Sequence, residues 1–270
     1  MRENPKMNRR LNWNWNRNAQ LVVVLLCAGA LKFFYSAASV NQLRWILAPT
    51  TFLVELVTGT RFQFESYAGY MSSDHTFLIA ASCAGVNFLI TAFLMLSLGK
   101  LWRARSQKLA WRFIPIAAVF AYVATLVANT VRISTALRLR SMPLAISWLT
   151  PDELHRLEGI LIYFGFLLLL LMVSEKMSYR NLTSRSSDRS ASLSSEELSG
   201  SARRSGLLRS CLFALLVYYA TTLGIPLVTG AYRPGAVSTG FWEHSLFVLL
   251  TPLVLILPLA VFRFFRGQRA

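Results

Sequence analysis

Three side chains that can take part in acyl transfer, Cys83, Arg132 and His155, occur in this order along the chain. A thiolate attacks carbonyl carbon atoms, and a histidine can take the thiol proton and return it to a leaving amine. A fixed guanidinium can donate hydrogen bonds to the oxyanion of a tetrahedral intermediate. A thiol near the start of a helix, close to a histidine and an arginine, is in surroundings that favour the thiolate. Together the three residue types predict cleavage or transfer of a peptide bond.

Each of the three residues also has a purely structural explanation. Cys83 could be a small apolar residue of a helix, and Arg132 could be an anchor that reaches lipid headgroups. His155 could be an interfacial residue at the start of a helix. The acidic residues before it, Asp152 and Glu153, could orient its ring or simply favour the helix N-terminus. The choice depends on the elements that position the three side chains.

These elements are predicted to lie in a membrane. Of the 270 residues, 54% are hydrophobic and only 15% are charged, whereas a soluble domain contains about 25% charged residues. This composition excludes a water-soluble globule and indicates an integral membrane protein in contact with the lipid bilayer. The net charge of +16 does not predict nucleic-acid binding, because the cations lie between apolar stretches, where they set membrane topology.

Six apolar stretches are long enough to cross a hydrocarbon core of about 30 Å, which takes roughly 20 residues. They are Gln20–Ala38, Phe77–Leu98, Phe113–Ile133, His155–Val173, Cys211–Gly230 and Ser245–Phe262. A seventh stretch, Leu43–Val57, is short and carries Arg44, Pro49 and Glu55. We predict an all-α polytopic membrane protein with about six transmembrane helices, in which this seventh stretch is an interfacial or re-entrant segment of the outer leaflet.

The distribution of Lys and Arg predicts the topology. With six spans, twenty of the 28 cations lie on the face that holds both termini, and Lys32 lies within the first span. The opposite face holds seven cations and seven acidic residues. If Leu43–Val57 also crossed, every later basic loop would move outside, which contradicts the positive-inside rule. Both termini are therefore predicted to be cytoplasmic, and Cys83, Arg132 and His155 then lie at the outer ends of their spans.

This topology divides the chain into four parts. Residues 1–19 form a cytoplasmic basic arm, and residues 20–173 form a four-span unit. Residues 174–209, rich in serine and arginine, have too little apolar surface to fold and are predicted to be a cytoplasmic linker. Residues 210–270 form a two-span hairpin. Because the sequence has no glycine-rich phosphate loop and no cluster of metal ligands, we expect no cofactor and no metal.

Three short motifs together resemble the signature of the exosortase and archaeosortase family. They are Ser82-Cys83-Ala84-Gly85 opening one span, Asn129-x-x-Arg132-Ile133 closing the next, and His155-x-x-x-Gly159 opening the one after. The stretch Cys83-Ala84-Gly85-Val86-Asn87-Phe88, with Leu47-Ala48-Pro49-Thr50 before it, is most similar to the K-type exosortases. The resemblance covers about residues 20–173, which is the predicted four-span unit.

The resemblance implies a membrane-embedded cysteine protease or transpeptidase with Cys83, Arg132 and His155 as its catalytic set. Its substrates would be exported proteins with a C-terminal sorting tail, which consists of a short motif, a membrane span and a basic cluster. Its active site would face the periplasmic, outer side of a bacterial cytoplasmic (inner) membrane. The candidate substrate-binding residues are Asn87, Asn129, Arg138 and Arg140. The chain departs from the simplest family pattern in its serine-rich loop and its C-terminal hairpin.

Two other functions stay open from the residues alone. The first is a polytopic transferase that acts on lipid-linked glycan or acyl donors, in which Arg132, Arg138 and Arg140 hold phosphates and Cys83 is structural. The second is a non-enzymatic export or assembly component whose outer-face polar residues contact partner proteins. Replacement of Cys83 by serine distinguishes them, because only the transpeptidase needs the thiol.

Overall fold

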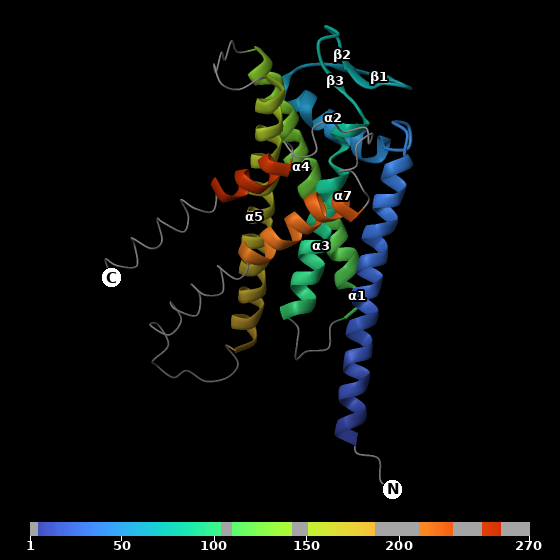
Figure 1. The fold of residues 1–270 in the computed structure, drawn as a ribbon, viewed down its shortest axis with the longest axis vertical. Coiled ribbons are helices and arrows are strands. Elements are labelled where there is room, and N and C mark those ends of the chain that lie inside the picture. Colours follow the sequence, from blue (N-terminus) through green and yellow to red (C-terminus); the bar gives the residue numbers. More distant parts are fainter. Residues whose placement is uncertain (1–4, 104–109, 142–150, 187–210, 229–244, 255–270) are drawn as a thin grey trace, which may run out of the picture. The chain divides into compact units, whose positions relative to one another are not determined.

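The computed structural model (Figure 1) describes residues 5–103, 110–141, 151–186, 211–228 and 245–254. These residues are mostly helical, and they include one small antiparallel sheet. The chain divides into two compact units, residues 1–127 and 128–270. The boundary falls within helix α4 (Phe113–Ser141), and thus not at the serine-rich segment where the sequence predicts a linker.

The first unit consists of three helices, a three-stranded sheet, a short 3-10 helix and the first part of α4. The bounds are α1 Pro5–Ala37, α2 Arg44–Thr58, β1 Phe62–Glu65, β2 Gly69–Ser72, β3 Leu78–Ile79, η1 Ala81–Ala84 and α3 Val86–Arg103. Helix α1 packs against α3, and Figure 1 shows the end of α1 and the start of α3 toward the sheet. The two helices therefore run in opposite directions.

Among the residues that the structure describes, four helical stretches are long and apolar enough to cross a membrane. They are Trp15–Ala37, Ala81–Arg103, Phe113–Arg140 and Arg156–Met177, and they overlap the first four predicted spans. The fifth and sixth predicted spans correspond, within the described residues, to the shorter apolar helices Cys211–Leu227 and Ser245–Val254. Helix α1 begins at Pro5, so most of the predicted basic arm is the first part of a helix.

Helix α2 is the segment that was predicted to stay in the outer leaflet. It has 15 residues, which at 1.5 Å per residue is about 22 Å, too short for a hydrocarbon core of about 30 Å. Gly59, in the left-handed conformation, ends the helix and donates its N–H to the carbonyl oxygen of Glu55. The buried residues recur at helical spacing: Ile46, Leu47, Thr50, Thr51 and Val54.

Two contacts attach α2 to its neighbours. The hydroxyl of Tyr122, in the first part of α4, donates to the carbonyl oxygen of Trp45 at 2.7 Å, and the two rings stack with centroids 5.8 Å apart. The guanidinium carbon of Arg44 lies 4.5 Å from the centre of the Phe64 ring in β1, which is a cation–π contact. Helix α2 is therefore attached to both α4 and the sheet.

The sequence does not predict the small sheet that accompanies the helices. Strand β1 pairs with β2 and β2 with β3, both antiparallel. Residues of β1 alternate between half-buried and exposed, which is typical of a strand. The alternation covers too few residues to be recognised as a strand in a sequence dominated by apolar runs of about 20 residues. Gly69 begins β2 with a φ of 133°, a conformation that favours glycine. A Cβ atom at this position would also collide with the carbonyl oxygen of Ile79.

The loop between β2 and β3 is built around Asp74. Its carboxylate accepts hydrogen bonds from the Ser72 hydroxyl at 2.6 Å, the Thr76 hydroxyl at 2.8 Å and the Thr76 N–H at 3.2 Å. These bonds stabilise the charged form and lower the pKa of Asp74 to about 2, the Ser72 hydroxyl contributing most. The neighbouring residue, His75, is exposed and has a φ of 54°. This loop is therefore a locally hydrogen-bonded turn.

The second unit contains the rest of α4, the long helix α5 (Pro151–Ser186) and the two shorter apolar helices. Helix α5 continues to Ser186, which corrects the prediction of an unfolded linker from residue 174 onward. The helix can continue this far because no glycine or proline interrupts residues 174–186. Phe164 of α5 is fully buried and meets Tyr218 edge to face, with ring centroids 5.4 Å apart.

The helix that begins at Cys211 contains a π-helical turn, η2 (Ala220–Gly224), before α7 (Ile225–Val228). Pro226 is the second residue after this turn. Proline lacks the N–H that would donate to the carbonyl four residues earlier, and wide turns of this kind accommodate such an interruption. Before the turn, Tyr219 donates its hydroxyl to the carbonyl oxygen of Leu249 at 2.7 Å, which links the two short helices.

Candidate active site

Cys83 lies in a bend between the sheet and helix α3, which is long and apolar enough to cross a membrane. Ala80 before it is extended, the Cys83 N–H donates to the Ala80 carbonyl at 2.9 Å, and the 3-10 helix η1 ends at Gly85 with a φ of 70°. Helix α3 then begins at Val86. The apolar stretch from Phe77 thus starts with an extended segment, and Cys83 precedes the N-terminal end of helix α3.

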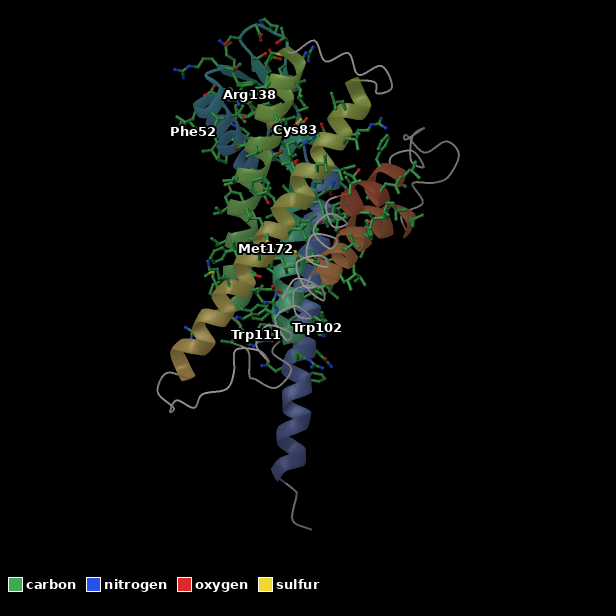
Figure 2. All side chains as sticks on the ribbon, turned by 90° about the vertical axis from the view of Figure 1, so that its left-hand side faces the viewer. Phe52, Cys83, Trp102, Trp111, Arg138 and Met172 are labelled. Carbon is green, nitrogen blue, oxygen red and sulfur yellow. The ribbon has the colours of Figure 1, made fainter. Side chains whose placement is uncertain are left out.

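The surroundings of the thiol are small and partly open. Ala84 is fully buried and Gly85 is buried, whereas Cys83 is partly exposed and Ser82 is exposed. Figure 2 shows Cys83 and Phe52 toward the sheet end of the first unit, and Trp102 and Trp111 toward its opposite end. The cysteine is therefore accessible at one end of its unit.

Asn87, in the first turn of α3, is held by a lysine of α1. Its side-chain oxygen accepts a hydrogen bond from Nζ of Lys32 at 2.8 Å. The ammonium of Lys32 also lies 5.8 Å from the centre of the Tyr35 ring. A charge inside a membrane span is costly unless it has such a partner, so this bond explains how α1 can carry a lysine. The substrate-binding role of Asn87 stays a prediction.

We expect Lys32→Met and Asn87→Leu each to lower the free energy of unfolding by about 1–2 kcal/mol, because each breaks the same charge-assisted hydrogen bond between α1 and α3. The double variant should lose about as much as one single variant. Thermal unfolding of the purified protein in detergent measures this. Lys100→Met, at an exposed position in the last turn of α3, is the control and should change little. Additive losses would contradict the coupling.

Arg132 is fixed by two polar residues of the second unit. Its Nη1 donates to the hydroxyl oxygen of Tyr163 in α5 at 3.3 Å, and the Tyr163 hydroxyl donates to the side-chain oxygen of Asn129 at 2.8 Å. The guanidinium carbon lies 5.4 Å from the centre of the Tyr163 ring. Asn129 is fully buried. Asn129 hydrogen-bonds the tyrosine that holds Arg132, and its substrate-binding role stays a prediction.

Gly159 gives Arg132 room to lie across α5. A Cβ atom at this glycine would be 3.0 Å from Nε of Arg132, closer than nearly all real contacts of that kind. His155 is one helical turn earlier on the same helix, about 6 Å along its axis. Its backbone belongs to α5, and its side chain lies outside the described residues. Within the second unit, Arg132 thus lies against the helix that carries His155.

Two residues of this region had no chemical role in the sequence analysis, Tyr163 and Glu158. Tyr163 follows Gly159 and His155 at intervals of four residues, which places all three on one side of a helix. A hydroxyl within an apolar span also needs a hydrogen-bond partner, so spacing and polarity together could have identified it. Glu158, beside Gly159, is buried, although the sequence analysis counted it only as an outer-face charge.

The remaining candidates, Arg138 and Arg140, are exposed in the last turn of α4. Figure 2 shows Arg138 and Met172 as labelled members of the second unit. Cations interact favourably with the negative end of a helix dipole, which accounts for both positions without a ligand. Among the His, Cys, Asp and Glu residues of the described ranges, no group of three or more is placed to hold a metal.

The structure therefore contains two groups of contacting polar residues, and each includes or adjoins a member of the predicted catalytic set. Cys83, with Asn87 and Lys32, belongs to the first unit, and Arg132, with Tyr163, belongs to the second. No protein-family model, curated protein or solved structure matches the chain. The resemblance to exosortases thus rests on the three short motifs alone, and the function that follows is inferred from residues and geometry.

Proposed function

We propose that this chain is an exosortase-like cysteine protease or transpeptidase embedded in the bacterial cytoplasmic membrane. It cleaves C-terminal sorting tails of exported proteins at the outer face and transfers the proteins to an acceptor. The observation that carries the proposal is the position of Cys83, which is partly exposed in a bend at the N-terminal end of a membrane-spanning helix. A cysteine buried within a helix would not support it.

In the proposed reaction, the Cys83 thiolate attacks the scissile carbonyl carbon and forms a tetrahedral intermediate. Arg132 donates hydrogen bonds to the oxyanion. His155 takes the thiol proton and gives it to the leaving amine as the C–N bond breaks, which leaves a thioester on Cys83. An acceptor amine, or water, then attacks the thioester, and the thiol is regenerated. None of these reaction steps needs a cofactor.

The neighbours of Cys83 support a peptide substrate. Ala84 and Gly85 are small, and the left-handed conformation of Gly85 turns the chain from η1 into α3. A peptide backbone can approach closely where no bulky side chain flanks the nucleophile. Ala84 and Gly85 therefore favour a substrate that presents its peptide backbone to the thiol over a lipid-linked donor with a large head group.

The tryptophans of the first unit support the proposed orientation in the membrane. Trp102 and Trp111 are exposed at the end opposite to Cys83 (Figure 2), and tryptophan is enriched at membrane interfaces. Lys100, Arg103 and Arg112 lie near them in sequence, as the positive-inside rule requires of a cytoplasmic end. The sheet and the thiol then belong to the outer end.

Deletion of this chain from its own cell tests the proposal. We expect exported proteins that end in an apolar span and a basic cluster to keep their tails, so that they increase in size and stay in the membrane fraction. Mass spectrometry of their C-terminal peptides, with and without the deletion, measures this. Exported proteins without such a tail are the control. If no tail-bearing protein changes its C-terminus, the proposal is wrong.

A further inference from the structure

We infer that Tyr163 is a positioning residue for Arg132: its hydroxyl, oriented by Asn129, holds the guanidinium in place for the transition state. The inference rests on the proposed function, in which Arg132 binds the oxyanion. It adds a residue that belongs to none of the three sequence motifs. The geometry that supports it lies entirely within the second unit.

The direction of the hydrogen bonds is the first support. A tyrosine hydroxyl has one proton to donate and can also accept. Here the proton goes to the side-chain oxygen of Asn129, at 2.8 Å, so the hydroxyl oxygen can accept from Nη1 of Arg132, at 3.3 Å. Asn129 and Arg132 are three residues apart on α4 and therefore share one side of that helix. Tyr163 bridges the two from α5.

The contacts around the guanidinium are the second support. The Tyr163 ring lies 5.4 Å from the guanidinium carbon, and Gly159, one turn earlier on α5, leaves space for Nε. The ring and the hydroxyl both contact the guanidinium, and Gly159 lies close to its Nε. An arginine side chain has many rotatable bonds. If it is already ordered before the reaction, it loses less conformational freedom when the transition state forms. Tyr163 therefore acts through Arg132 and does not need to touch the substrate.

This role predicts a specific kinetic change in Tyr163→Phe. The ring and its cation–π contact remain, while the hydroxyl that orients the guanidinium is lost. Arg132 is proposed to act on the oxyanion, which forms during the chemical step and is absent from the bound substrate. The loss should therefore lower kcat and leave KM nearly unchanged. We expect kcat to fall about tenfold, as for one hydrogen bond to a charged group.

The experiment follows a tail-bearing precursor of the same cell by pulse–chase, once with precursor in excess and once with precursor limiting. Tyr219→Phe is the matched control, because it loses a comparable hydrogen bond, to the Leu249 carbonyl at 2.7 Å, in the same unit. Abundance and thermal unfolding are measured for both variants. We expect the two to be similarly stable, with a tenfold slower rate at excess precursor for Tyr163→Phe alone.

A second comparison tests whether Tyr163 acts through Arg132. In an Arg132→Lys background, Tyr163→Phe should change the residual rate less than twofold, because the planar fork that the hydroxyl holds is gone. Equal slowing in the two tyrosine variants, a wild-type rate in Tyr163→Phe, or a full tenfold effect in the Arg132→Lys background would each overturn the inference. Processing that continues in Cys83→Ser would instead overturn the proposed function, and this inference with it.

Discussion

Cells that carry Cys83→Ser are expected to accumulate tail-bearing precursors at full length, with processing slowed by more than about a thousandfold. A serine hydroxyl is hardly ionised at neutral pH, whereas the proposed reaction starts from a thiolate. The substitution exchanges one sulfur for one oxygen at a partly exposed position of η1. Insertion and abundance should therefore stay close to wild type. Pulse–chase labelling and gel mobility measure the effect.

The control for this prediction is the double variant Cys27→Ala, Cys211→Ala. Cys27 is exposed in α1, and Cys211 begins the helix Cys211–Leu227, so neither lies near η1 in the chain. We expect this variant to process precursors at the wild-type rate. Loss of processing in an inserted, abundant double variant would mean that the nucleophile is not Cys83. Full processing in Cys83→Ser would favour the lipid-linked transferase or the non-enzymatic component.

Arg132→Lys is expected to be nearly as damaging as Arg132→Ala, with processing slowed by about a hundredfold in each. A guanidinium is a planar fork that can donate to Tyr163 and to the oxyanion at the same time, whereas an ammonium is a flexible point charge. The contact that fixes the side chain, from Nη1 to the Tyr163 hydroxyl, is also lost. The same pulse–chase assay, at excess precursor, gives the rates.

Arg156→Lys is the matched control for Arg132→Lys. Arg156 is exposed on α5, directly after His155 in sequence. Because this change keeps the charge at the surface of the same helix, we expect a wild-type rate. A wild-type rate in Arg132→Lys as well would reduce Arg132 to an interfacial anchor, which is the structural explanation that the sequence leaves open.

The positions of the first four spans could be predicted from the sequence because hydropathy is a property of one continuous segment. In a membrane, the backbone N–H and C=O groups of a run of about 20 apolar residues must be satisfied by hydrogen bonds within the run itself, which makes it a helix. The distribution of Lys and Arg, through the positive-inside rule, is what excluded the segment of α2 from the predicted spans. Cys83, Arg132 and Gly159 were also identified in sequence, since their residue types and spacing resemble a known signature.

Elements shorter than the apolar runs were not predicted. The three strands have four, four and two residues, and strand pairing depends on partners elsewhere in the chain. The start of α3 at Val86, and with it the bend around Cys83, follows from that sheet. A hydropathy pattern cannot distinguish this extended segment from a helix, because both are apolar here.

Only the tertiary structure decided which polar residues meet between helices. Lys32 pairs with Asn87 across 55 residues of sequence, and Arg132 pairs with Tyr163 across 31. Such pairs depend on how one helix is rotated and shifted against another, which neither helix specifies by itself. The sequence by itself therefore predicted the four helices that are long and apolar enough to cross a membrane, and it supplied the candidate residues for chemistry. The fold determined that Arg132 is held by Tyr163 and Asn129, because hydrogen bonds between helices form only once the helices pack.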